Sequence, residues 1–204
     1  KDFMQEQIKI LAELTRLRQI CCAPDLCLED YSGGSGKMDA CMELIDNAIS
    51  GGHRILVFSQ FTQMLEKLID AYKDRGSYLY LSGKSTKEQR RQMVDQFQKG
   101  DVPVFFISLK AGGTGLNLTA ADVVIHYDPW WNVAAQNQAT DRTHRIGQKN
   151  VVTVLKLVAK NTIEEKILKL QEEKAKLAEN IIEGDMAAQH HISRDELMEL
   201  LKNT

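Results

Sequence analysis

One amide and two guanidinium groups share a face of a predicted helix. Gln138, Arg142 and Arg145 are spaced at i, i+4 and i+7, so their side chains project from one side of an α-helix. Two like charges this close repel each other unless an anion or a carboxylate lies between them. The spacing leaves two roles open: a surface ion pair with Asp141, or a site for a polyphosphate.

A glycine-rich loop is the second candidate anion site. The sequence from 108 to 117 reads SLKAGGTGLN and follows an apolar strand pattern. Its glycines allow backbone amides to approach an anion closely, and Lys110 and Thr114 are the side chains best suited to a phosphate contact. A tight turn that binds nothing is the alternative.

Polar side chains also occur at the other strand ends. Ser59 and Gln60 end the first predicted core strand, and a helix start further on carries hydroxyls and cations. Such groups suit contacts with a nucleic-acid backbone, which hold a protein in place without reading sequence. The residues at that helix start are Ser85, Thr86, Lys87 and Arg90.

Trp130 and Trp131 are adjacent in a predicted strand-to-helix loop, so both cannot point into one core. We expect Trp130 to pack on the sheet and Trp131 to be exposed. An exposed aromatic face can stack on bases or sugars, which contributes about 1–3 kcal/mol for each stack.

These residues require an α/β scaffold. Strands that are apolar throughout alternate with helices, which predicts a parallel sheet with helices on both faces. Ligands bind such sheets beyond the carboxyl ends of the strands. We predict strands at 55–59, 78–81, 103–108, 123–127 and 151–158, helices at 62–75, 86–99 and 133–143, a leading helix at 3–22, a loop at 31–37 and a trailing helix at 162–182.

Composition limits the possible partners. The 204 residues carry 26 Lys and Arg against 28 Asp and Glu, so any anion site must be local. The four cysteines include no CxxC pair, so we expect reduced thiols and no metal site. No apolar run approaches the roughly 20 residues of a membrane helix, so we expect no membrane partner.

Two glycine-containing segments do not match known nucleotide-binding motifs. The segment ending at Gly36-Lys37 lacks the first glycine and the Ser/Thr of a phosphate loop, since Tyr31 and Met38 occupy those positions. The pair Gly113 and Gly115 lacks the third glycine of a dinucleotide fingerprint, where Leu118 stands.

Four sequence blocks together resemble a known family. The blocks ILVFSQF, LSGKSTKEQRRQMVDQF, FFISLKAGGTGLNLTAADVVIHYDPWWN and QATDRTHRIGQ follow the order and spacing of the second RecA-like lobe of SWI/SNF-type ATPases of helicase superfamily two. The resemblance covers about residues 11 to 183. Ala23 departs from it, because the family's L-x-x-L-R-x-x-C-x-H-P element usually has His there.

The resemblance implies one half of an ATP-driven motor on double-stranded DNA. It implies a RecA-like helicase C-terminal lobe at 38–160, with a leading helix and linker at 1–37 and a brace helix and helical tail at 161–204. Arg142 and Arg145 correspond to the arginine fingers, with Gln138 beside them; Gly113 and Gly115 join the arginines around the ATP. Lys110, Thr114, Trp131 and the strand-end residues named above correspond to DNA contacts.

The same resemblance implies that the chain needs a partner lobe. The sequence has no phosphate loop and no D-E-x-H box, so we expect an N-terminal RecA-like lobe of the same protein to hold Mg²⁺ and this fragment to be inactive alone. A protein bound to DNA is a further expected substrate. We expect a bacterial cytoplasmic location at the nucleoid, or a nuclear one in a eukaryote. Two alternatives stay open: a non-catalytic nucleic-acid-binding module, and the lobe of an RNA-dependent superfamily-two ATPase.

Overall fold

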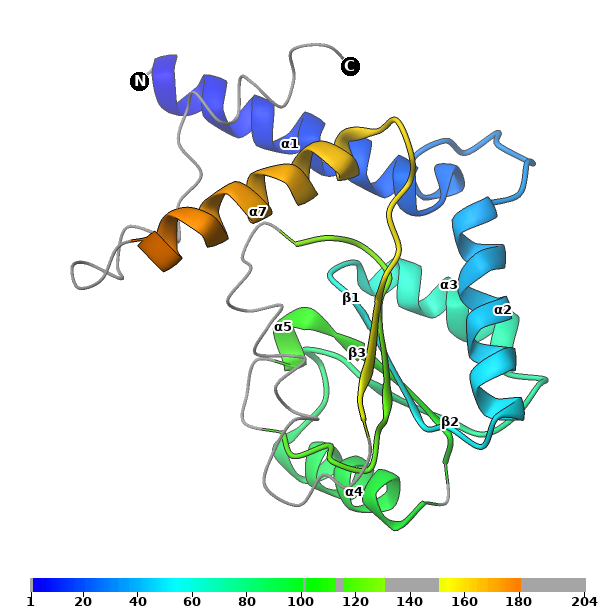
Figure 1. Cartoon of the computed structure of the whole chain (residues 1–204). Coiled ribbons are helices and arrows are strands. Elements are labelled where there is room, and N and C mark those ends of the chain that lie inside the picture. Colours follow the sequence, from blue (N-terminus) through cyan, green and yellow to red (C-terminus); the bar gives the residue numbers. More distant parts are fainter. Residues whose placement is uncertain (1, 101, 113–115, 131–150, 181–204) are drawn as a thin grey trace.

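A five-stranded parallel sheet forms the centre of the chain, as predicted (Figure 1). The computed structural model describes residues 2–100, 102–112, 116–130 and 151–180. Within these ranges the strand order is β2-β3-β1-β4-β5. The strands are β1 (Ile55–Ser59), β2 (Tyr78–Leu81), β3 (Val104–Ser108), β4 (Val123–His126) and β5 (Thr153–Lys156).

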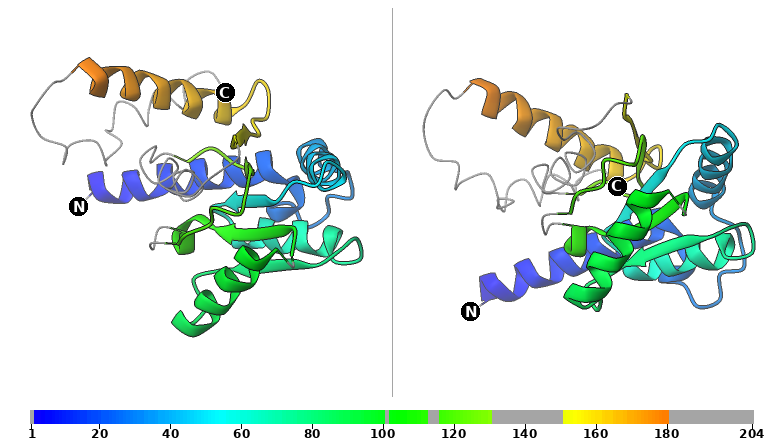
Figure 2. Two further views of the ribbon diagram at one scale, coloured as in Figure 1. Left: turned by 60° about the horizontal axis from the view of Figure 1, so that its bottom comes forward. Right: turned by 90° about the horizontal axis from the view of Figure 1, so that it is seen from below.

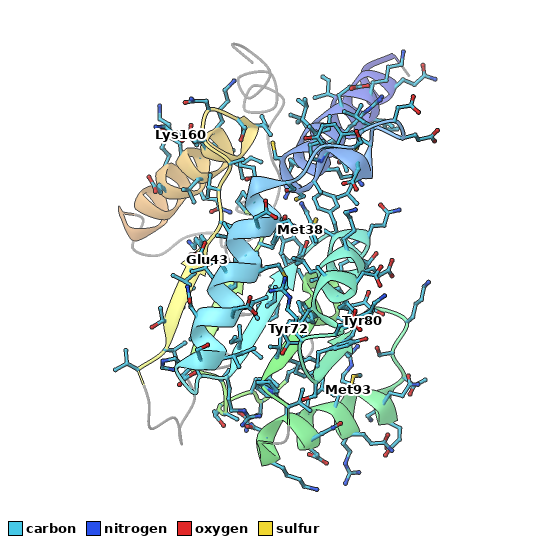
Figure 3. All side chains as sticks on the ribbon, turned by 90° about the vertical axis from the view of Figure 1, so that its right-hand side faces the viewer. Met38, Glu43, Tyr72, Tyr80, Met93 and Lys160 are labelled. Carbon is cyan, nitrogen blue, oxygen red and sulfur yellow. The ribbon has the colours of Figure 1, made fainter. Side chains whose placement is uncertain are left out.

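Helices cover both faces of the sheet, which confirms the predicted layers. On one face α2 (Gly36–Ser50) and α3 (Thr62–Tyr72) bury Ile55 and Val57 of β1. On the other face α4 (Lys87–Lys99) and the short α5 (Leu109–Gly112) bury Leu56 and Phe58. Figure 2 shows α4 across the sheet from α2. Figure 3 looks onto α2, with Met38 in its first turn and Tyr72 at the end of α3.

Two long helices lie side by side outside these layers (Figure 1). They are α1 (Asp2–Cys22), which a 3₁₀ turn at Pro24–Leu26 follows, and α7 (Ile163–Asn180). Leu14 of α1 packs with Ile163 and Ile167 of α7 in a small buried cluster. The predicted leading and trailing helices are therefore present. No helix in the four described ranges is both long enough and apolar enough to span a bilayer.

Two helices were missed by the sequence analysis. Helix α2 lies where no element was predicted, and it begins inside the loop predicted at 31–37. Ser35 is the N-cap of α2, since the Ser35 hydroxyl accepts from the Met38 backbone N–H. Cys41 and Ile45 are buried on the inner face of the helix. Helix α5 occupies the start of the predicted glycine-rich loop. The predicted helix 133–143 lies outside the described residues, and the division into three units stays a prediction.

A buried ion pair joins α2 to α7. The Lys37 ammonium lies 2.6 Å from both carboxylate oxygens of Glu164, and the two side chains are 8% and 0% exposed. The same ammonium lies 5.2 Å from the centre of the Tyr127 ring. Glu164 also accepts from the Ala159 backbone N–H at 2.7 Å. Lys37, from the segment that resembles a phosphate loop, therefore joins α2 to α7 through Glu164.

The Lys37→Met substitution should destabilise the chain strongly, because it leaves the Glu164 carboxylate buried without its partner. The expected loss in free energy of unfolding is about 3–5 kcal/mol, measured by urea denaturation. Lys73→Met is the matched control, since the Lys73–Asp70 pair is 51% and 74% exposed and solvent screens it, so its loss should change the free energy of unfolding far less. Equal losses in the two variants would contradict this assignment.

His126 in β4 should make stability depend on pH. Its side chain is buried against Phe58, and burial, with a smaller effect of Lys156, lowers its pKa from 6.5 to about 4. The folded state therefore holds fewer protons than the unfolded state between these two values. The free energy of unfolding is therefore highest above pH 6.5, and it decreases by about 3 kcal/mol as the pH falls from 6.5 through 4. His126→Leu should flatten this part of a plot of unfolding free energy against pH, and an unchanged slope would contradict the assignment.

Candidate nucleic-acid interface

The parallel register aligns the ends of three neighbouring strands. Ser59 at the end of β1 pairs with Ser108 at the end of β3, and Leu81 at the end of β2 pairs with Ile107. The chain therefore leaves all three strands at the same edge of the sheet. This register brings together the predicted DNA contacts Gln60 and Lys110.

A pocket of about 230 Å³ lies at this edge. Lys84 and Lys110 line it and are both exposed, while Glu66 is the single carboxylate among its lining residues. The local charge is thus positive although the whole chain carries a formal −2. The remaining lining residues are Gln60, Thr62, Tyr80, Ser82, Gly83 and Ser108.

Two buried polar atoms at the pocket have no hydrogen-bond partner among the described residues. The Gln60 side-chain nitrogen and the Ser108 hydroxyl make no hydrogen bond within the described part of the chain. Ser108 is only 2% exposed. A buried polar group without a partner costs about 1–3 kcal/mol, so an oxygen-rich ligand that accepts from both would relieve that cost. Phosphate oxygens have this chemistry.

Ser59 differs from its register partner Ser108 because its hydroxyl is hydrogen-bonded within the protein. Its side chain is fully buried, and its hydroxyl donates to Asp128 while accepting from the Phe61 backbone N–H at 3.1 Å. Its hydroxyl therefore shapes the turn that presents Gln60. A direct contact between Ser59 and DNA stays a prediction that would require this turn to open.

The start of α4 is fixed by local hydrogen bonds. Thr86 is the N-cap, and it forms a capping box in which its hydroxyl accepts from the Gln89 N–H at 3.2 Å. The Ser85 hydroxyl accepts from the Ser82 N–H at 3.2 Å. Lys87 is exposed in the first turn of the helix. Lys87 is thus the cation at this helix start whose exposure best suits a backbone contact.

Arg90 connects α4 to α5. Its guanidinium donates to the Ala111 carbonyl at 2.8 Å, one residue beyond Lys110. This bond fixes the turn on which Lys110 is exposed. Arg90 therefore has a positioning contact in this structure, and its predicted contact with DNA stays a prediction.

The predicted nucleotide-side residues lie outside the described residues, so their geometry is not part of this site. They are Gly113, Gly115, Gln138, Arg142 and Arg145, together with the predicted DNA contacts Thr114 and Trp131. Trp130 is described, and its side chain packs partly buried against the α4 face of the sheet, as predicted. Within the described ranges no three His, Cys, Asp or Glu side chains cluster as a metal site.

Several residues of the pocket were not predicted from the sequence. Ser108 was assigned only to the start of a loop, although the end of a buried strand at the ligand-binding edge is itself a signal. Lys84 was not assigned a role, because the predicted contacts there start at Ser85. Tyr80 and Glu66 could not be found from sequence, since they approach the pocket from a strand and a helix whose packing only the structure gives.

A family model and solved structures match this chain over most of its helicase-like core. The family model described as helicase conserved C-terminal domain matches residues 36–147. The solved Sulfolobus solfataricus SWI2/SNF2 ATPase C-terminal domain matches at a TM-score of 0.71 and 34% identity, over 96% of this chain and 82% of that one. The chain belongs to the SWI2/SNF2 family as a helicase C-terminal lobe.

Two further relatives extend this result. The Sulfolobus solfataricus SWI2/SNF2 ATPase core in complex with dsDNA matches at a TM-score of 0.72 and 35% identity, over 96% of this chain and 42% of that one. An uncharacterised ATP-dependent helicase of Mycoplasma pneumoniae is 38% identical over 97% of this chain and 19% of its own length. The SWI2/SNF2 lobe described here thus spans about a fifth of the length of the curated bacterial relatives it matches.

Lys110→Ala in the SWI2/SNF2 lobe should weaken binding of duplex DNA without changing any sequence preference. Loss of one phosphate contact should reduce the slope of log affinity against log salt concentration by about 1. Lys99→Ala is the matched control, because Lys99 is also an exposed lysine and lies in the last turn of α4. Fluorescence anisotropy with a labelled duplex measures both variants, and the same slope for Lys110→Ala and wild type would remove Lys110 from the interface.

Proposed function

We propose that this chain is the second motor lobe of an ATP-dependent translocase on double-stranded DNA. The chain binds the phosphate backbone at the carboxyl edge of its sheet. The observation that carries the proposal is the pocket at this edge, where Lys84 and Lys110 lie with the Gln60 amide nitrogen and the Ser108 hydroxyl, which have no partner within the described ranges. The dsDNA complex of a similar SWI2/SNF2 core supports the choice of duplex over other polyanions.

The nucleotide side of the motor is proposed from sequence. Arg142 and Arg145 reach the phosphates of ATP from this lobe, with Gln138 helping to position them and Gly113 and Gly115 nearby. ATP supplies the phosphoryl group whose transfer drives the motor. A guanidinium fixed in a cleft stabilises the charge that develops on that group, because it does not need to reorganise.

A preceding RecA-like lobe of the same protein completes the site. It supplies the phosphate loop and the carboxylates that hold Mg²⁺, since this sequence contains neither motif. The isolated lobe is therefore inactive in ATP hydrolysis. A protein bound to DNA is the proposed roadblock on which the motor acts. The proposed location is the bacterial cytoplasm at the nucleoid, or the nucleus in a eukaryotic host.

Arg145→Lys in the full-length protein should abolish ATP turnover while nucleotide binding persists. A lysine keeps the positive charge but loses the planar fork of the guanidinium, and such fingers contribute roughly 10³–10⁵-fold to turnover. Steady-state hydrolysis with duplex DNA measures turnover, and a fluorescent ATP analogue measures binding. Arg91→Lys on the exposed side of α4 is the matched control, with wild-type behaviour expected. Wild-type turnover by Arg145→Lys would end the assignment, whereas stimulation by RNA alone would favour an RNA-dependent motor.

A further inference from the structure

A buried carboxylate beneath the pocket links it to another part of the lobe. Asp128 is 1% exposed and follows the end of β4. Its carboxylate accepts from the Ser59 hydroxyl and from the Gln60 backbone N–H at 3.4 Å. Its other partner is Arg18 of α1, whose guanidinium lies 3.9 Å away. Asp128 therefore contacts the turn that presents Gln60 from inside the protein.

Arg18 extends this contact toward the backbone that follows Asp128. It is 2% exposed, and it donates to the Pro129 carbonyl at 2.6 Å. Its guanidinium also lies 5.6 Å from the centre of the Phe61 ring, next to Gln60. One arginine thus contacts both the turn after β1 and the segment after β4. The two segments are held in a fixed relation to each other.

The next peptide group is also held by a side chain. Gln171 of α7 donates to the Trp130 carbonyl. Consecutive carbonyls, at Pro129 and Trp130, are therefore bound from α1 and from α7, which lie side by side (Figure 1). In sequence the chain then continues to Trp131 and on to the two arginines.

The electrostatics favour a positioning role over a stabilising one. Burial raises the pKa of Asp128, and the Ser59 hydrogen bond and the Arg18 charge oppose that rise. Burial lowers the pKa of Arg18, and Asp128 opposes that change. An ion pair buried at this cost adds little net stability compared with apolar residues of similar size, but it penalises any other arrangement of the two segments.

We propose that Asp128 is a positioning residue that joins the DNA-facing turn at Gln60 to the backbone at Pro129, so that DNA in the pocket raises the rate of ATP turnover. Arg18 is its partner in this role. The inference rests on the proposed DNA-dependent ATPase activity. It adds the residues through which DNA bound at Gln60 affects ATP turnover, namely Asp128 and the backbone at Pro129.

The Lys37–Glu164 pair is a matched control within the same fold. Its side chains are as buried as those of Arg18 and Asp128, at 8% and 0% against 3% and 0%. It joins α2 to α7, and the hydrogen bonds and ion pair of these two side chains in the described ranges include neither the turn after β1 nor Pro129. The Glu164 charge affects the pKa of Arg18 less than Asp128 does, and the Lys37 charge affects the pKa of Asp128 less than Arg18 does. Breaking it should lower stability without changing how DNA stimulates turnover.

The experiment compares Asp128→Asn with Glu164→Gln in the full-length protein. Asn keeps the shape and the acceptor oxygen for Ser59, but it loses the charge that orients Arg18. We expect Asp128→Asn to keep wild-type turnover without DNA and a wild-type KM for ATP. Stimulation at saturating duplex DNA should fall roughly 10-fold, within the 5–150-fold range typical of coupled sites. Glu164→Gln should lower the melting temperature and leave the stimulation ratio unchanged.

A double-mutant cycle tests whether Arg18 and Asp128 affect DNA stimulation together or independently. If Arg18 and Asp128 act as one unit, Arg18→Gln combined with Asp128→Asn should lose no more stimulation than either change alone. Ser59→Ala is the second route if Asp128→Asn does not fold, because it removes one contact to Asp128 without leaving a buried charge unpaired. It should also reduce stimulation.

Three results would overturn the inference. They are wild-type stimulation in a folded Asp128→Asn or Ser59→Ala variant, additive losses in the double variant, and an equal loss of stimulation in Glu164→Gln. Absence of DNA stimulation in the wild-type protein is a different result. It would overturn the proposed function itself, and circular dichroism and melting temperatures of all variants keep these outcomes distinct from misfolding.

Discussion

The in-register parallel pairing of β1, β2 and β3 is the constraint on which the rest of the structure depends. Because these strands run in one direction and end at one level, their loops must meet at a single edge. Two lysines lie there with two buried polar groups that have no partner in the described part of the chain, and these residues come from three separate segments of the sequence. A chain with slightly more acidic than basic residues obtains a local site for an anion in this way.

Buried charges determine where the outer helices lie. The apolar cluster between α1 and α7 is small, with Leu14, Ile163 and Ile167 at its centre. The two helices are instead fixed to the core through Arg18 with Asp128 and through Glu164 with Lys37. Buried ion pairs add little net stability, but a mispaired charge in the interior is costly. They therefore specify one position of the helices around the loop after β4.

Local patterns predicted most of the fold and only part of the site. The apolar strands and their alternation with helices predicted the parallel sheet. Gln60 and Lys110 directly follow two of these strands, which predicted their position at the ligand-binding edge. Helix α2 was missed because Gly33 and Gly34 before it, with Gly36 and Lys37 in its first turn, resemble a loop, whereas its buried face depends on tertiary packing. The roles of Lys37 and Arg18 could not be predicted, since their partners lie 127 and 111 residues away in sequence.

A structure of the full-length protein on duplex DNA would show which edge of the sheet contacts the phosphate backbone. We expect a backbone phosphate in the pocket at the carboxyl edge, with its oxygens about 3 Å from the Ser108 hydroxyl and the Gln60 amide nitrogen and close to Lys110. A duplex bound at the opposite edge of the sheet, with these groups still unpartnered, would contradict this expectation.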